Sequence, residues 1–564
     1  MKLKPRQVKL FNKLVKFVKN KDNDVNQFLV EGEGGAGKTF SISYTLLKLL
    51  KKKHFNSCNL HFIAPTNAAK KVLRNTIQEL LKNDSDAYTV YEKHTKVDMN
   101  ISYNTIHSFF KSKKTYDENG NQMFEIVYNK TIMTEMMKDQ AGRGLNKRKN
   151  LIILDEVSML DPEKYKLFEM LLEKYQDTKV IFMGDRNQLS YVDEDNNKKE
   201  IDYLSPVFTT VKEYFLLKGN ERTNDEKITK IINKAKKCVV KNKYKFVLTK
   251  KDLSENIKVI TDHEFVNNEK IRDFIKEKKP KLITYSNKRR QKLNNEVREM
   301  IYTKENVYID RYLFLEGEEI IFDNTYMLDS ITYHNTDEAK VISVKYDIME
   351  RVSFFSLFSK MFMIQKIVLE GDSTPLYQIC KEQLPTFKLM IKVLKKCVKD
   401  FFGFNVSRAK FDKKEKCVCE FCNEKKTLFK TYYNETEKIC KGCYMKVREY
   451  IKQTFYCKCC GKVILKTHNC NYSRLINKSK EKKHIFNMMF EILCTVEEKY
   501  DLPVSYSYAI TVYKSQGSSY PNVVIDYDNI VSCNRNSVKN LTRAMYVSVS
   551  RVQEKLWFLN YRYL

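Results

Sequence analysis

One glycine-rich segment, residues 31–40, limits what this chain can fold into more than any other part of its sequence. It reads EGEGGAGKTF, follows the apolar run Phe28–Val30, and precedes an amphipathic stretch that ends near Leu50. An apolar run, a glycine-rich turn and an amphipathic segment predict a strand, a tight loop and a helix, in that order.

The loop has the spacing of a phosphate-binding loop. Gly32 is followed, after four residues, by Gly37, Lys38 and Thr39, which matches the pattern G-x-x-x-x-G-K-[ST]. Glycines let backbone N–H groups converge on an anion at the start of a helix. We expect Lys38 to reach the β- and γ-phosphates of a nucleoside triphosphate and Thr39 to ligate Mg²⁺. The predicted site residues here are Gly32, Gly34, Gly35, Ala36, Gly37, Lys38 and Thr39.

Two later strands end in polar residues that suit the same site. The buried run Leu151–Leu154 ends at Asp155 and Glu156. We assign Asp155 as a Mg²⁺ ligand and Glu156 as the group that polarises the attacking water, although an Asp-Glu pair can also cap a helix. The strand KVIFMG is followed by DRNQLS, in which Gln188 is placed to sense a γ-phosphate.

Composition points to a polyanionic partner. The 564 residues include 102 basic and 70 acidic side chains, which gives a formal net charge of +32. Such an excess favours phosphate backbones, although biased codon usage also enriches lysine. No uninterrupted apolar run reaches the length of a membrane span, and the N-terminus lacks a secretory segment. We therefore expect an intracellular, soluble protein, in the nucleus or the cytoplasm, whose 15 cysteines are thiols or metal ligands.

Seven motifs in order resemble those of superfamily 1 helicases. They read GEGGAGKT, APTNAAK, TIHSFF, LDEVSML, GDRNQL, TVYKSQG and YVSVSR, and they are most similar to the 1B branch of RecD- and phage Dda-like enzymes. The resemblance covers roughly residues 1–310 and 500–564. It implies an α/β fold with two RecA-like domains and parallel sheets, the first over 1–200 and the second over 201–310 and 500–564. Residues 311–499 are then an insertion in the second domain.

The resemblance also implies roles for individual residues. Gln7 is similar to an adenine-reading glutamine, Arg222 and Arg551 to arginines that reach the γ-phosphate from the second domain, and Gly517 to a nucleotide contact. Tyr513 stands where the family usually carries histidine, so this contact with the nucleic acid strand is expected to be retuned. The residues that the resemblance assigns to single-stranded DNA are Pro65, Thr66, Asn67, Thr105, His107, Asn287, Asn294, Thr511, Tyr513 and Ser515.

Two further segments suggest attachments to this motor. Within 111–149, Asn119-Gly120 lies between β-prone flanks, a strong hairpin signal. The resemblance implies a wedge at the duplex fork, and a passive surface hairpin is the alternative. Residues 311–346 alternate in strand fashion and resemble the opening strands of the small SH3-like barrel that the family inserts into its second motor domain. The segments FFSLFSKMFMIQKIVL and TFKLMIKVLKKCVKDFF, within 347–410, look helical.

A cysteine cluster predicts zinc within 411–475. Cys419, Cys422, Cys440 and Cys443 have the C-x-x-C spacing of a closed four-thiolate site. A second site would use Cys457, Cys460, His468 and Cys470, and cross-brace pairing of the ligand pairs is an alternative. We expect two structural Zn²⁺ ions, with DNA contact or docking of a protein partner as further roles for the module.

The sequence therefore predicts a monomeric motor that uses ATP and Mg²⁺, moves 5′ to 3′ on single-stranded DNA and opens forked DNA. Arg222 and Arg551 lie far from the phosphate loop in sequence, so a second lobe must bring them to it, and lobe closure on ATP would drive stepping. Two alternatives stay open: a superfamily 1 RNA helicase, and a zinc-dependent nucleic-acid-binding ATPase that switches without unwinding.

Overall fold

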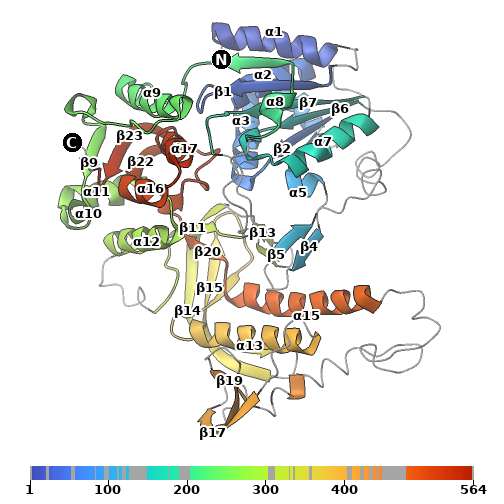
Figure 1. Cartoon of the computed structure of the whole chain (residues 1–564), viewed down its shortest axis with the longest axis vertical. Helices are drawn as coiled ribbons and strands as arrows, with labels where there is room; N and C mark the ends of the chain where they lie inside the picture. The colour runs from blue at the N-terminus through green and yellow to red at the C-terminus, as the bar shows by residue number, and fades with distance from the viewer. Residues whose placement is uncertain are drawn as a thin grey trace. The chain divides into compact units, whose positions relative to one another are not determined.

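The computed structural model of the chain divides into two compact units (Figure 1). Unit 1 comprises residues 1–112, 126–303 and 506–564, and unit 2 comprises 113–125 and 304–505. The structure describes residues 3–20, 25–52, 58–82, 84–93, 101–110, 113–116, 122–125, 149–175, 177–189, 204–302, 311–324, 326–328, 331–333, 337–354, 358–402, 410–418, 425–430, 436–440, 443, 445–447 and 478–561.

The first lobe of unit 1 is built on a six-stranded parallel sheet in the order β3-β2-β6-β7-β1-β8. Because neighbouring parallel strands need crossovers, the chain alternates strands with helices. β8 belongs to this sheet, so the first lobe extends beyond the boundary at residue 200 predicted from the sequence. The strands are β1 (Gln27–Gly32), β2 (Cys58–Ala64), β3 (Ile101–Thr105), β6 (Lys149–Leu154), β7 (Thr178–Gly184) and β8 (Tyr214–Leu217).

Helices cover both faces of this sheet (Figure 1). Phe28 and Val30 of β1 pack into one apolar cluster and Leu29 into the other, as the alternation of side chains along a strand requires. One face carries α1 (Pro5–Lys19), α2 (Lys38–Lys51), α3 (Asn67–Lys82) and α4 (Ser85–Glu92). The other carries α5 (Ile106–Phe109), the 3₁₀ turn η2 (Val157–Met159), α7 (Pro162–Lys174) and α8 (Val207–Thr210).

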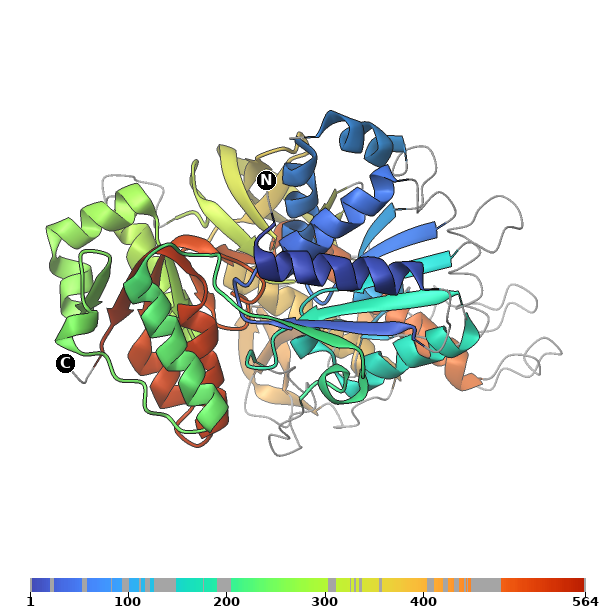
Figure 2. The ribbon, with the colours of Figure 1, turned by 90° about the horizontal axis from the view of Figure 1, so that it is seen from above.

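The second lobe of unit 1 has a five-stranded parallel sheet in the order β21-β10-β22-β23-β9. Helices α9 and α17 pack on each other, and Figure 2 shows them side by side in green and red. Its strands are β9 (Ile257–Ile260), β10 (Lys281–Thr284), β21 (Ala509–Thr511), β22 (Tyr520–Asp526) and β23 (Val552–Leu559). Its helical segments are α9 (Glu226–Lys241), η3 (Lys250–Asp252), α10 (Asp262–Asn267), α11 (Glu269–Lys278), α12 (Asn287–Ile301), α16 (Tyr527–Cys533) and α17 (Val538–Val549).

These two sheets confirm the predicted fold class. Both are parallel and both carry helices, as the α/β prediction of two RecA-like domains requires. In the first lobe the strands that precede the phosphate loop and Asp155 lie in one sheet. The carboxyl ends of these strands therefore meet at one edge, where open α/β sheets bind ligands.

Unit 2 is built on a sheet in the order β16-β15-β14-β11-β20, backed by two helices. Alternate residues of the long hairpin β14–β15 join one apolar cluster with α13 and α15. These elements are β11 (Glu319–Phe322), β14 (Glu338–Phe354), β15 (Phe358–Leu369), β16 (Leu376–Ile379), β20 (Val504–Tyr506), α13 (Leu384–Phe402) and α15 (Lys478–Tyr500).

The prediction of a helix for FFSLFSKMFMIQKIVL was wrong, because β15 occupies Phe358–Leu369. Phe358, Phe362 and Ile364 are buried, whereas Ser359 and Met361 are exposed, so buried side chains here fall on alternate positions, as in a strand with one covered face. Short apolar runs are ambiguous between helix and strand, and the antiparallel partner β14 decides the outcome here. The second segment, TFKLMIKVLKKCVKDFF, is helical as predicted and forms most of α13.

Smaller elements complete unit 2. β4 pairs with β5 where the hairpin was predicted, and the Asn119-Gly120 turn lies outside the described residues. β12 pairs with β13, and β17, β18 and β19 form a three-stranded antiparallel sheet. Their bounds are β4 (Lys113–Tyr116), β5 (Gln122–Glu125), β12 (Tyr326–Leu328), β13 (Ile331–Tyr333), β17 (Lys410–Val418), β18 (Lys425–Lys430) and β19 (Thr436–Cys440). Among the helices that the structure describes, none is both long and apolar enough to cross a membrane.

Candidate active site

The loop between β1 and α2 has the backbone that its glycines predict. Gly35 and Gly37 have φ angles of 86° and 79°, values that L-residues with a side chain rarely adopt. Gly37 is the N-cap of α2, and the Ala36 N–H donates to the Glu33 carbonyl at 3.0 Å. The loop therefore wraps tightly and presents the start of α2, the geometry that binds a phosphate group.

Lys38 and Thr39 are held next to the acidic strand end. The buried Lys38 ammonium donates to the carbonyls of Gly32 at 2.7 Å and Glu33 at 3.1 Å. The Thr39 hydroxyl donates to Asp155 Oδ2 at 3.1 Å. A hydroxyl and a carboxylate are hard oxygen ligands, so this pair fits Mg²⁺ bound beside a triphosphate. The structure thus brings together three of the residues predicted to handle phosphate.

Glu156 is held in a strained conformation beside Asp155. Its φ and ψ are 51° and 45°, the left-handed region, which costs a residue with a side chain roughly 1–2 kcal/mol. Its Oε2 atom is buried and has no hydrogen-bond partner among the residues that the structure describes. Burial and the neighbouring Glu156 carboxylate raise the pKa of Asp155. A strained carboxylate with an unused acceptor is suited to orienting a water molecule.

The third strand end presents a buried amide. Gln188 is 1 % exposed, and its Oε1 atom has no partner in the described part of the chain. Asp185, three residues earlier, accepts a hydrogen bond from the Gly34 N–H at 3.0 Å. The end of β7 is therefore attached directly to the phosphate loop, as expected if Gln188 reports on the γ-phosphate.

Arg222 lies beside the phosphate loop, and Arg551 lies close enough to Arg222 for the two charges to interact. The Arg222 guanidinium donates to the Ser550 carbonyl, next in sequence to Arg551. Arg551 is fully buried, donates to the carbonyls of Val547 at 3.1 Å and Ser518 at 3.3 Å, and has an Nη2 atom without a partner among the described residues. Burial and the charge of Arg551 lower the pKa of Arg222, as expected of two cations held close together to meet an anion.

Gln7 lies against the outer side of the phosphate loop. Its Nε2 atom is 2.9 Å from the point where a Cβ on Gly37 would stand, and its Oε1 accepts from the Lys4 N–H at 2.9 Å. Lys4 also forms an ion pair with Glu221, whose N–H donates to the Gly35 carbonyl at 2.7 Å. The predicted adenine-reading residue is thus fixed beside the loop by the segment that precedes Arg222.

The residues of the first lobe that are predicted to contact single-stranded DNA lie at the ends of two neighbouring β-strands. Ala64 of β2 is paired with Thr105 of β3, so APTNAAK and TIHSFF begin side by side. The hydroxyls of Thr66 and Thr105 each accept from a backbone N–H at 3.2 Å and so begin the following helices. Pro65 is partly buried.

Two polar side chains accompany these threonines. The Asn67 Oδ1 atom is buried without a partner in the part of the chain that the structure describes. His107 is partly buried, and burial lowers its pKa, with a further contribution from the positive charge of Lys164. A neutral His107 can exchange hydrogen bonds with a base or a phosphate without an added charge.

Residues predicted to contact DNA in the second lobe divide into two groups. Asn287 is exposed at the start of α12, and Tyr513 is partly buried, with its hydroxyl 3.4 Å from that of Tyr285. Asn294, in contrast, is 2 % exposed and exchanges hydrogen bonds with the backbone of Ala509 at 2.7 and 3.2 Å. Both polar atoms of this amide join α12 to β21, which supports a structural role, and the predicted DNA contact at Asn294 stays a prediction.

The TVYKSQG segment is similarly used partly for structure. The buried Ser515 hydroxyl donates to the Val512 carbonyl at 2.7 Å, which leaves it unsuited to the predicted DNA contact. The Thr511 hydroxyl accepts from the Lys514 N–H at 3.4 Å. Gly517, with a φ of 78°, packs against Ala69 of α3, where a Cβ would stand 3.2 Å from that of Ala69. This segment thus connects the second lobe to the APTNAAK helix.

Sequence reasoning missed several residues that join the lobes. Tyr546 donates to Asp185 at 2.7 Å, Arg543 donates to the Gln188 carbonyl at 2.9 Å, and Gln516 donates to the Leu189 carbonyl at 3.3 Å. All three lie within or next to motifs already recognised, TVYKSQG and YVSVSR. Only the fold shows that they meet the end of β7.

The fold and this site define a P-loop nucleoside triphosphatase with two RecA-like lobes. Two family models match the chain: an AAA domain over residues 17–194 and a UvrD-like helicase C-terminal domain over residues 506–559. The RecBCD enzyme subunit RecD of Buchnera aphidicola is 25 % identical over 39 % of this chain and 33 % of its own length. These matches confirm the predicted resemblance to superfamily 1B helicases, and they support an ATP-dependent helicase.

Other proteins are similar over the whole chain. Uncharacterized protein R530 of Acanthamoeba polyphaga mimivirus is 23 % identical over 97 % of this chain and 98 % of its own length. A Pif1 helicase from Candida albicans is 13 % identical and covers 100 % of this chain and 96 % of its own, with a TM-score of 0.41. A Bacteroides Pif1 helicase in complex with ADP-AlF3 and single-stranded DNA is also 13 % identical, covers 100 % and 93 %, and has a TM-score of 0.39.

Proposed function

We propose that this chain is an ATP-dependent DNA helicase that translocates 5′ to 3′ on single-stranded DNA and unwinds forked DNA. The observation that carries the proposal is the meeting of both lobes at the phosphate loop. Lys38, Thr39 and Asp155 come from the first lobe, and Arg551 comes from the second. An arginine from a second lobe can stabilise the charge of the transition state only when the two lobes are closed, so hydrolysis would depend on lobe closure.

Each residue has a distinct task in this proposal. Lys38 and the loop N–H groups bind the phosphates, while Thr39 and Asp155 hold Mg²⁺, which would offset phosphate charge. Glu156 orients the attacking water and accepts its proton through the unpartnered Oε2. Gln188, Arg222 and Arg551 sense the γ-phosphate, and the two arginines stabilise the charge that develops on it.

Direct connections support coupling between the nucleotide and the nucleic acid. Gln516 reaches the residue after Gln188, and the adjoining Gly517 packs on the helix that begins at Asn67. A change at the γ-phosphate can therefore move the TVYKSQG segment and the strand ends around Thr66 together. We propose that Pro65, Thr66, Asn67, Thr105, His107, Asn287, Thr511 and Tyr513 face the DNA strand.

A tailed-duplex unwinding assay tests this function. DNA duplexes with a single-stranded 5′ or 3′ tail, and matched RNA duplexes, are incubated with ATP and Mg²⁺. We expect opening of the 5′-tailed DNA only, and none with Lys38→Ala, which removes the ammonium from the phosphate loop. Opening of RNA alone would favour the RNA helicase. Hydrolysis without any opening would favour the ATPase switch.

We further propose that the cysteine-rich part of unit 2 binds two structural zinc ions. Cys440 ends β19, and Cys443, three residues later, is 3 % exposed and lies in the apolar cluster of β14, β15, α13 and α15. The proposal rests on the C-x-x-C spacing of this pair, which is that of a zinc knuckle. The other six predicted ligands lie outside the described residues. Among the described residues, no group of three or more metal-ligating side chains occurs. Metal analysis of the purified chain should find two zinc ions per chain and fewer in Cys440→Ser, and a metal-free chain would contradict the proposal.

A further inference from the structure

A three-way hydrogen-bonded contact joins the phosphate loop to the second lobe. The Tyr546 hydroxyl, on α17, donates to Asp185 Oδ2 at 2.7 Å. The Gly34 N–H donates both to the same Asp185 oxygen at 3.0 Å and to the Tyr546 oxygen at 3.2 Å. One side chain of the second lobe therefore touches the phosphate loop and the end of β7 at once.

This contact is fully enclosed. Tyr546 is 0 % and Asp185 1 % exposed, so water does not compete for either group. Burial and the Asp185 carboxylate raise the pKa of Tyr546 well above its ordinary value, so its hydroxyl keeps its proton and stays a donor. A hydrogen bond to a buried carboxylate is strong and directional, and such a contact fixes geometry well.

The same point of the loop lies beside Arg222 and beside Ser550, the residue before Arg551. A Cβ on Gly34 would stand 3.3 Å from the Ser550 hydroxyl and 3.7 Å from Arg222 Nη1. Arg551 is attached to the same helix, since its Nε donates to the carbonyl of Val547, the residue after Tyr546. A displacement of Tyr546 relative to Gly34 would therefore displace Arg551 relative to the bound phosphates.

We propose that Tyr546 is a positioning residue that sets the register between the phosphate loop and Arg551, the arginine that the second lobe contributes. The inference rests on the proposed ATP hydrolysis. It goes beyond that proposal by assigning the residue that aligns the two lobes that form the site. Tyr546 does not touch the reacting atoms. It acts through Asp185 and Gly34, so its hydroxyl should affect turnover more than ATP binding.

The test is Tyr546→Phe, which keeps the ring and removes only the hydroxyl. ATP hydrolysis is measured on the full chain with single-stranded DNA present. We expect kcat to fall about tenfold, which corresponds to about 1.4 kcal/mol of transition-state stabilisation, with KM for ATP changed by less than about twofold. The matched control is Tyr527→Phe, because Tyr527 is also buried in the second lobe and its hydroxyl pairs with Tyr244. This control should keep the kcat of the unchanged chain.

A double-mutant cycle separates positioning from a general loss of packing. Asp185→Asn alone should lower kcat, and Tyr546→Phe combined with Asp185→Asn should lower it little further, because both changes break one contact. Independent, additive effects of the two changes, or an unchanged kcat in Tyr546→Phe, would overturn the inference. Absence of DNA stimulation in the unchanged chain would contradict the proposed function instead, and the basal kcat of the same variants would still test Tyr546.

Discussion

At the scale of single residues, sequence spacing predicts which residues form the nucleotide site. It does not predict which hydrogen-bond partners a polar side chain finds. The motif that contains Lys38 and Thr39 predicts their neighbourhood with Asp155, and in the structure Thr39 donates a hydrogen bond to Asp155 while Lys38 donates to the Gly32 carbonyl. Asn294 shows the limit of such reasoning. Its place in a motif suggested DNA contact, but the backbone of Ala509, 215 residues away in sequence, occupies its amide.

Glu156→Gln tests the water-orienting role at this scale. The amide cannot accept a proton, so we expect kcat for ATP hydrolysis to fall by a factor of about 10²–10⁴. ATP binding should persist, because Lys38 and the loop N–H groups are unchanged. Equilibrium binding of a fluorescent ATP analogue together with steady-state hydrolysis distinguishes the two effects, and a near-normal kcat would exclude Glu156 from this role.

Asn294→Ala and Asn287→Ala form a matched pair that distinguishes a structural role of Asn294 from the predicted DNA contact. Loss of the buried Asn294 amide leaves the Ala509 N–H unsatisfied, and we expect a loss of about 1–3 kcal/mol in stability. Asn287 is exposed, so its replacement should leave the melting temperature unchanged and weaken binding of single-stranded DNA. Thermal unfolding and fluorescence anisotropy measure these outcomes. Weaker DNA binding by Asn294→Ala without loss of stability would support the predicted DNA contact at Asn294.

At the scale of elements, the sequence predicts the first lobe better than unit 2. Parallel strands buried on both faces read as continuous apolar runs, and each run here ends in a recognisable polar motif. β15 was missed because its strand conformation depends on pairing with β14 and on the apolar cluster with α13. Local sequence does not contain that information.

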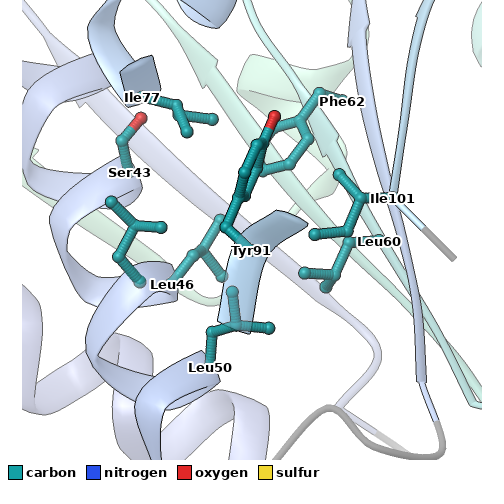
Figure 3. A pocket seen from close by; sticks show the side chains of 9 residues that line it. Ser43, Leu46, Leu50, Leu60, Phe62, Ile77, Tyr91 and Ile101 are labelled. Carbon is teal, nitrogen blue, oxygen red and sulfur yellow. The ribbon is translucent and has the colours of Figure 1, made fainter. Parts of the chain in front are cut away.

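Helix α2 carries a buried hydroxyl group beside an apolar hollow. An apolar hollow in the first lobe is lined by residues of α2, β2, β3, α3 and α4 (Figure 3). Ser43 of α2 faces it, and its hydroxyl has no hydrogen-bond partner among the described residues. A buried, unpaired hydroxyl destabilises a fold, and serine is also a poorer helix former than alanine.

Ser43→Ala should therefore stabilise the first lobe by about 1 kcal/mol and raise its melting temperature by about 2–4 °C. The control is Thr45→Val two residues further along α2, because the Thr45 hydroxyl is paired with the Ser41 carbonyl at 2.7 Å. This control should give no gain. Differential scanning calorimetry measures both variants, and an unchanged or lower melting temperature for Ser43→Ala would show that the hydroxyl is satisfied in solution.

At the scale of the whole molecule, we propose that ATP hydrolysis needs both lobes of unit 1 together. Arg222 lies beside Gly35 of the phosphate loop and donates to Ser550, the residue before Arg551. Tyr546, Arg543 and Gln516 of the second lobe contact the end of β7. Sequence spacing cannot reveal such a joint, since its partners are more than 300 residues apart. The order of motifs predicted that it exists, and the structure shows which side chains form it.

The most direct test is the rate of ATP hydrolysis by the purified chain with and without a single-stranded DNA oligonucleotide, at saturating ATP and Mg²⁺. If DNA binding and nucleotide binding are coupled through the contacts between the two lobes, the rate should rise several-fold when DNA is added. Arg551→Ala should remove both this rise and most of the basal rate. Equal rates with and without DNA would contradict the account.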